Sequence, residues 1–142
     1  MRLLACGGRD YHNRDRVFAT LDRINEKRPI TAIIEGAATG ADALAAEWAM
    51  ARGVQLCECP AGWKIHGKKA GPVRNEFMAS LAPDGAVAFG GGTGTAHMIG
   101  ILKRRGIAVM EVDRDDTWDT PADTAPSAGR TTTDADAAGG AK

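Results

Sequence analysis

Three short segments of the sequence combine glycines with side chains that bind anions. They are Gly7-Gly8-Arg9-Asp10, Gly36-Ala37-Ala38-Thr39-Gly40-Ala41-Asp42 and Gly90-Gly91-Gly92-Thr93-Gly94-Thr95. Glycine allows the main chain to approach a phosphate group closely, and the free N–H groups at the start of a helix attract negative charge. The three segments therefore predict a binding site for an anionic ligand, with phosphate as the favoured group.

The third segment is the most distinctive, because it holds four glycines and two threonines in six residues. It is not a P-loop, which ends in Gly-Lys-Ser or Gly-Lys-Thr, because Thr95 directly follows Gly94 and Ala96 comes next. It also lacks the G-x-G-x-x-G spacing of dinucleotide-binding loops. We expect it to bind phosphate without P-loop-type ATP hydrolysis, and the alternative is a plain strand-to-helix connection.

Charged side chains accompany the first two segments. Arg9 is suited to pair with a phosphate and Asp10 with a ribose hydroxyl, although a surface ion pair would explain both residues equally well. Asp42 falls in the first turn of an expected helix, where it either faces the ligand or stabilises the helix end.

A fourth segment, beginning at Gly71, places Arg74 and Asn75 near the start of a helix. Arg74 would clamp a phosphate or carboxylate and Asn75 would donate a hydrogen bond, unless this is simply a solvated helix start. Residues 64–69 are rich in Lys and His and form either a lid over an anion or a solvated loop. The candidate ligand-binding residues are Gly8, Arg9, Asp10, Gly36, Thr39, Gly40, Asp42, Gly71, Arg74, Asn75, Gly91, Gly92, Thr93, Gly94 and Thr95.

No metal site or required cofactor is expected. Cys57 and Cys59 resemble half of a metal site, but no second cysteine pair accompanies them. The three histidines, His12, His66 and His97, show no metal-binding spacing, and no pairing of residues typical of nucleophilic catalysis is present.

Short apolar runs alternate with amphipathic segments along the first 112 residues. The expected strands are 1–6, 31–35, 54–58, 85–89 and 107–112. A first helix is expected after Asn13 or Asp10, and a second over 40–52. A third is expected from Pro72, with Val73, Phe77 and Leu81 facing the core. A fourth is expected over 95–105, with Thr95 as its cap. This alternation predicts an α/β fold, a Rossmann-like three-layer domain with a mainly parallel sheet of about five strands.

The 142 residues, 44% of them hydrophobic, suffice for one domain. The formal net charge is zero, yet residues 113–142 carry seven aspartates against three basic residues. We expect residues 1–112 to form the domain and residues 113–142 to be a disordered acidic C-terminal tail. No apolar run is long enough for a membrane span and no secretory signal is evident, so a cytoplasmic protein is expected.

Four segments in this order resemble the YspA-like, cpYpsA-related branch of the SLOG superfamily, which is named after the Smf/DprA and Lonely Guy proteins. They are Gly8-Arg9-Asp10-Tyr11, residues 35–42, Ala70-Gly71-Pro72-Val73-Arg74-Asn75 and residues 90–98. The resemblance covers residues 1–112 and implies a SLOG-like Rossmannoid nucleotide-binding domain. Some relatives sense nucleotide-derived ligands, and Smf/DprA relatives bind single-stranded DNA.

The Lonely Guy relatives are phosphoribohydrolases with a PGGxGTxxE loop and an upstream Arg. Four residues of the loop match (Gly91, Gly92, Gly94 and Thr95), and Arg74 resembles the upstream Arg. Gly90 replaces the proline of that loop, and Met98 replaces its glutamate. A thioether cannot do the work of a carboxylate, so hydrolysis would need a substitute from Asp42, Asp10 or Glu76. Arg74 and Asp42 are therefore the catalytic candidates, and enzymatic activity is left open.

Three functions follow from these observations. The first is binding or sensing of a nucleotide or nucleotide-derived ligand, such as an NAD- or ADP-ribose-like molecule or a nucleoside phosphate. The second is N-glycoside hydrolysis of a nucleoside phosphate in the same pocket. The third, single-stranded nucleic-acid binding, is disfavoured because aromatic residues make up only 5% of the chain. Trp48 and Trp63 are candidates for a homo-oligomer interface.

Overall fold

The computed structural model describes residues 1–113 of the chain. The expected acidic tail lies outside the described residues, apart from Asp113. Within residues 1–113, no helix has the length and apolar character needed to cross a membrane.

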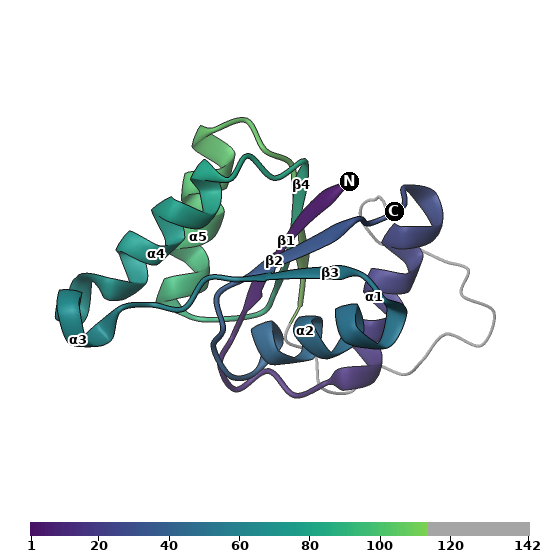
Figure 1. The fold of residues 1–142 in the computed structure, drawn as a ribbon, viewed down its shortest axis with the longest axis horizontal. Helices are drawn as coiled ribbons and strands as arrows, with labels where there is room; N and C mark the ends of the chain where they lie inside the picture. The colour runs from purple at the N-terminus through teal and green to yellow at the C-terminus, as the bar shows by residue number, and fades with distance from the viewer. Residues whose placement is uncertain (114–142) are drawn as a thin grey trace.

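The described residues form one parallel sheet of five strands (Figure 1). The strands are β1 (Arg2–Gly7), β2 (Ala32–Glu35), β3 (Gln55–Glu58), β4 (Gly85–Phe89) and β5 (Val109–Val112). Their order across the sheet is β3-β2-β1-β4-β5, and every neighbouring pair is parallel. This confirms the α/β Rossmann-like fold expected from the alternation of apolar runs.

Two helices cover each face of the sheet, which completes the three layers (Figure 1). Helices α1 (Arg14–Lys27) and α2 (Ala41–Arg52) pack on one face, and α4 (Ala70–Ser80) and α5 (Thr93–Arg104) pack on the other. A short helix α3 (Trp63–His66) and a 3-10 turn η1 (Gly67–Lys69) lead into α4. The segment considered as a lid, 64–69, thus has local helical structure.

Local signals in the sequence explain the first two helices. The side chain of Asn13 accepts a hydrogen bond from the Arg16 N–H at 3.1 Å and caps α1, while Val17 and Leu21 are fully buried beneath it. Gly53 ends α2 with φ of 68°, the left-handed conformation that glycine adopts without strain.

The buried face of α4 differs from the expectation. Val73 and Phe77 are 44% and 54% exposed, whereas Met78 and Ala79 are buried against α5 and the sheet. The prediction from apolar spacing was wrong for Val73 and Phe77, because the buried face contains a polar residue, Asn75, and small alanines. Leu81, directly after the helix, is partly buried against this core as expected. Asn75 can be buried because its amide finds hydrogen-bond partners on α5.

The start of α5 also differs from the expectation. The helix begins at Thr93, with Gly92 at its N-cap, so Thr95 lies inside the first turn and does not cap it. Gly92 has no side chain to accept a hydrogen bond, which leaves the first N–H groups of α5 without a capping side chain.

The strand order reverses direction between β1 and β4. The chain moves from β1 toward β2 and β3 on one side, and from β4 to β5 on the other. In such sheets the loops that leave the two central strands diverge, which opens a crevice beyond their carboxyl ends. The Gly8 N–H donates to the Gly90 carbonyl at 3.2 Å and ties the two loops together at the base of this crevice.

Candidate functional site

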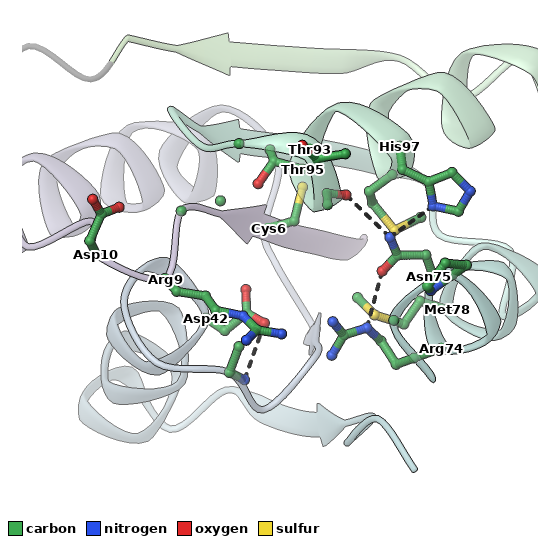
Figure 2. A pocket seen from close by; sticks show the side chains of 18 of the residues that line it. Cys6, Arg9, Asp10, Asp42, Arg74, Asn75, Met78, Thr93, Thr95 and His97 are labelled. Atoms are coloured by element: carbon green, nitrogen blue, oxygen red, sulfur yellow. Dashed lines mark hydrogen bonds between the residues drawn. The ribbon is translucent and has the colours of Figure 1, made fainter. Parts of the chain in front are cut away.

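A cleft of about 620 Å³ lies beyond the carboxyl ends of β1 and β4, bordered by the first turns of α4 and α5 (Figure 2). Most of the residues expected from the sequence to bind a ligand line it. These are Gly8, Arg9, Asp10, Asp42, Gly71, Arg74, Asn75, Gly92, Thr93, Gly94 and Thr95. The topology therefore brings three separate segments and Asp42 to one place.

Four expected residues do not line the cleft but support its walls: Gly36, Thr39, Gly40 and Gly91. The hydroxyl of Thr39 donates to the Arg9 carbonyl at 3.0 Å, which joins the loops after β2 and β1. Gly40 has φ of 76°, and a Cβ there would collide with the backbone of Gly8 and Arg9. A Cβ on Gly91 would collide with Thr95 and the Gly8 nitrogen. These glycines allow backbone segments to pack closely behind the cleft.

Asp42 is a buried carboxylate at the edge of the cleft. Its Oδ2 atom accepts hydrogen bonds from the N–H groups of Gly36, at 3.1 Å, and Ala38, at 3.3 Å. Burial raises the pKa of Asp42 to about 6, although these hydrogen bonds and the charges of Arg74 and Arg9 act in the opposite direction. Asp42 therefore holds the loop after β2 in place and also presents a titratable group to the cleft.

Arg74 is held in a fixed orientation on the opposite wall. Its Nη1 atom donates to the Gly36 carbonyl at 2.5 Å, and its Nε atom donates to Oδ1 of Asn75 at 3.0 Å. Among the described residues, Nη2 makes no hydrogen bond, so it is available to a ligand. Figure 2 shows the guanidinium groups of Arg9 and Arg74 pointing toward each other near Asp42.

Asn75 links α4 to the first turns of α5. Its Nδ2 atom donates to the Gly94 carbonyl at 3.2 Å and lies 3.1 Å from Nδ1 of His97 (Figure 2). His97 lines the cleft as well. Because one amide bonds Arg74, Gly94 and His97, the position of Arg74 is coupled to that of the glycine-rich helix start.

Met98 occupies the position where the resembling hydrolases carry glutamate. It is 1% exposed and lines the cleft, so no carboxylate is present at this point of α5. Of the three substitutes considered, Asp42 and Asp10 line the cleft. Glu76 does not, and its carboxylate lies 3.9 Å from the Arg105 guanidinium on the surface. Asp42 is the buried one of the two cleft carboxylates.

Glu35 was not among the residues expected to bind a ligand, and it is fully buried at the end of β2. It lies opposite Glu58 in the parallel register of β2 and β3, and its Oε1 atom accepts the Ala37 N–H at 2.5 Å. Burial raises the pKa of Glu35 to about 8, and a hydrogen bond with the Glu58 carboxyl adds to the rise. Two signals could have indicated it: its position at the end of an otherwise apolar run, TAIIE, and its place at the start of the segment 35–42 that carries the family resemblance.

Cys6, Trp63 and Met78 also line the cleft and were not assigned to it from the sequence. Lys68, from the segment considered as a lid, lines it as well. Burial raises the pKa of the Cys6 thiol to about 12, and the nearby Asp42 carboxylate adds to this effect. Cys6 is therefore a neutral thiol at physiological pH, and it is unsuited to act as a nucleophile.

Cys57 and Cys59, the half-site considered for a metal, lie at the end of β3 and just after it. Among residues 1–113, no group of three or more His, Cys, Asp or Glu side chains is placed to hold a metal ion. The expectation that no metal is needed stays a prediction.

Comparison with known proteins gives two matches. The family model described as "YspA, cpYpsA-related SLOG family" matches residues 1–66, which include the loops after β1 and β2. Gene 61 protein of Mycobacterium phage D29 is 33% identical over 117 residues, covering 77% of this chain and 94% of the phage protein.

Proposed function

The chain belongs to the YspA, cpYpsA-related SLOG family, and from this premise we propose that its cleft binds a nucleotide or nucleotide-derived anion. The observation that carries the proposal is the meeting of the uncapped start of α5 with the guanidinium groups of Arg9 and Arg74 in one cleft. Backbone N–H groups at a helix start and arginine side chains are the two commonest protein partners of a phosphate.

The proposed binding mode assigns a role to each wall. A phosphate lies on the first turn of α5, at Gly92, Thr93 and Gly94, and accepts a hydrogen bond from Nη2 of Arg74. Asp10, at the β1 side of the cleft, is placed to accept a hydrogen bond from a ribose hydroxyl. A volume of about 620 Å³ is in the range of small-molecule sites and accommodates a mononucleotide.

Thermal denaturation in the presence of AMP, NAD and ADP-ribose tests the proposal. A ligand at 100 times its Kd stabilises the folded state by about 2.7 kcal/mol, which corresponds to a rise in Tm of roughly 10 °C for a domain of this size. We expect such a rise with at least one of the three compounds. No rise with any of them would contradict the proposal.

A pair of glycine substitutions locates the phosphate. A Cβ on Gly92 or Gly94 meets no atom within 4 Å, so Gly92→Val with Gly94→Val should fold normally and fill the proposed phosphate position. Gly100→Val, on the same helix but outside the cleft, is the matched control. The double variant should lose the ligand-induced rise in Tm, and the control should keep it. Equal rises in both variants would contradict the assignment to α5.

N-glycoside hydrolysis of the bound nucleotide is the second candidate, and Asp42 is the observation that favours it. Its carboxyl lines the cleft between two arginines, and with a pKa of about 6 it is mainly ionised at pH 7. A carboxylate in this position is able to stabilise an oxocarbenium-like transition state. Water would add across the N-glycosidic bond, so mass spectrometry of the same incubations would detect the free base and the base-free remainder of the ligand, which for AMP are adenine and ribose 5-phosphate. Asp42→Asn should abolish their release while ligand binding persists. Intact ligand after prolonged incubation would exclude this activity.

Self-association and the absence of a required cofactor stay predictions of the sequence. Trp48, one of the two residues considered for an interface, is fully buried and hydrogen-bonds Asp22, so it does not contribute to a surface. Trp63 is 47% exposed and lies at the cleft.

A further inference from the structure

Trp63 combines a large exposed aromatic surface with a position in the cleft. It is the first residue of α3, lines the cleft and is 47% exposed. A Cβ built on Gly71 would lie 3.6 Å from Cη2 of the indole, so the ring packs along the glycine backbone at the start of α4. The absence of a side chain at Gly71 lets the indole approach α4 closely.

The face of the indole already contacts a planar group. The guanidinium carbon of Arg9 lies 5.3 Å from the ring centroid, a cation–π contact between the loop after β1 and α3. Arg9 is exposed, and guanidinium contacts of this kind are weak where water has access. A planar heterocycle would compete well for this surface because it buries more apolar area and stacks on the ring.

Trp63 and the start of α5 border different parts of the same cleft. The indole lies beside Gly71 at the start of α4. Asn75, one helical turn further along α4, contacts Gly94 at the start of α5. One end of the cleft is therefore anion-binding and the other is aromatic.

We infer that Trp63 stacks on the base of the bound nucleotide and makes the cleft selective for ligands that carry a base over ribose phosphates that lack one. This inference rests on the proposed function and adds the part of the ligand that the glycine-rich loops leave undefined. Arg9 either stacks on the second face of the base or turns toward the phosphate when the base displaces it.

Titration calorimetry with AMP and with ribose 5-phosphate, which is AMP without its base, tests the inference. Trp63→Leu should weaken AMP binding by about 5- to 150-fold, the range measured for loss of one base–aromatic stack. Its affinity for ribose 5-phosphate should stay within about twofold of the wild-type value. Trp63→Phe should recover most of the AMP affinity, since it restores an aromatic face.

Ile65→Leu is the matched control, because it alters the same short helix at a residue that is 83% exposed. It should change the affinity for neither AMP nor ribose 5-phosphate.

Fluorescence provides a second readout that does not depend on the leucine variant folding. AMP should change the tryptophan emission of the wild-type protein, and this change should be absent in Trp63→Phe. Equal losses of affinity for AMP and ribose 5-phosphate in Trp63→Leu, or no loss for either, would overturn this inference alone. A wild-type protein that binds none of AMP, NAD, ADP-ribose and ribose 5-phosphate overturns the proposed function and this inference with it.

Discussion

Glu35 is buried at the end of a strand, where an ionised carboxylate would lose its hydration, and within residues 1–113 its charged neighbours are the carboxylates of Glu58 and Asp42. The folded protein keeps it protonated well above the ordinary pKa of 4.5, because of burial and the nearby Glu58 carboxyl. A carboxyl group whose pKa differs between the folded and the unfolded protein makes the free energy of unfolding depend on pH. The direction of the dependence is set by which of the two states binds the proton more tightly.

We predict that the free energy of unfolding falls as the pH rises from about 4.5 to about 8. In this window the unfolded chain has released the Glu35 proton and the folded chain still binds it, so Glu35 contributes a slope of at most about 1.4 kcal/mol per pH unit. Asp42, whose pKa is also raised, to about 6, adds to the slope at the acid end of the window. Below the window both states hold the proton and the contribution is fully present. Glu35→Gln should remove this component of the slope and make the protein more stable than the wild type at pH 8.

Urea denaturation at pH 5, 6.5 and 8 measures the effect. Glu47→Gln is the control, because Glu47 is exposed and pairs with Arg14 on the surface. It should leave the slope unchanged. Parallel pH profiles for the wild type and Glu35→Gln would show that Glu35 does not titrate in this range.

At the level of single residues, sequence reasoning located most of the polar side chains of the site, including the buried Asp42 and Asn75, and missed its apolar and sulfur-containing residues. Arg74 and Asp42 were recognisable because they stand beside glycines at the start of helices. Nothing in the sequence indicated that Asp42 bonds the backbone of Gly36 and Ala38, because this depends on how the loop after β2 folds back. Cys6 was not recognisable as a cleft residue, since its apolar context reads as core.

At the level of elements, α4 decides which residues reach the site. Its first turns carry Gly71, Arg74 and Asn75 to the cleft, and its second half packs Met78 and Ala79 into the core. The exposed side of the helix carries Val73 and Phe77. This rotation of α4 about its axis is the part of the fold that apolar spacing predicted wrongly, and it can be tested by stability alone.

We predict that Met78→Ala lowers the free energy of unfolding by about 2–4 kcal/mol, because Met78 is 2% exposed and its loss leaves a cavity against α5. Phe77→Ala removes a larger side chain from the neighbouring position, yet it should cost less than about 1 kcal/mol, since Phe77 is 54% exposed. Chemical denaturation of the two variants makes the comparison. A larger loss for Phe77→Ala than for Met78→Ala would mean that α4 is turned the other way.

The strands and the other long helices were predictable to within a few residues, whereas α3 and the turn η1 lie in a stretch that was expected to be a loop. The strand over 85–89 was predicted with the bounds that β4 has, because GAVAF is apolar throughout and is followed by glycines. The start of α5 was placed two residues late, since threonine was taken as the cap although glycine occupies that position. The spacing of apolar residues is enough to locate strands and helices along the sequence. It does not identify the buried face of α4, because that face includes the polar, hydrogen-bonded Asn75.

At the level of the whole molecule, the strand order creates the site. Alternating strands and helices predicted parallel strands, and parallel strands place their following loops on one edge. The sequence could not say that β4 returns to lie beside β1, which brings residues 8–10 and 92–95 together although more than eighty residues separate them. The cleft therefore belongs to the α4–α5 side and the central strands, while α1 and the body of α2 pack on a separate core.

The separation between the cleft on the α4–α5 side and the core beneath α1 and α2 predicts where AMP slows amide hydrogen exchange. Ligand contacts should slow exchange in residues 8–10, 63–75 and 92–98 together, because these segments form the walls of one cleft. Exchange in α1 should slow less than in these segments, and by no more than the ligand stabilises the whole fold, since its buried residues Val17 and Leu21 belong to the core on the opposite face of the sheet. Slower exchange in residues 63–67 alone would place the ligand outside the cleft, on α3. Equal slowing of all helices would mean that AMP stabilises the fold globally rather than by joining these three segments.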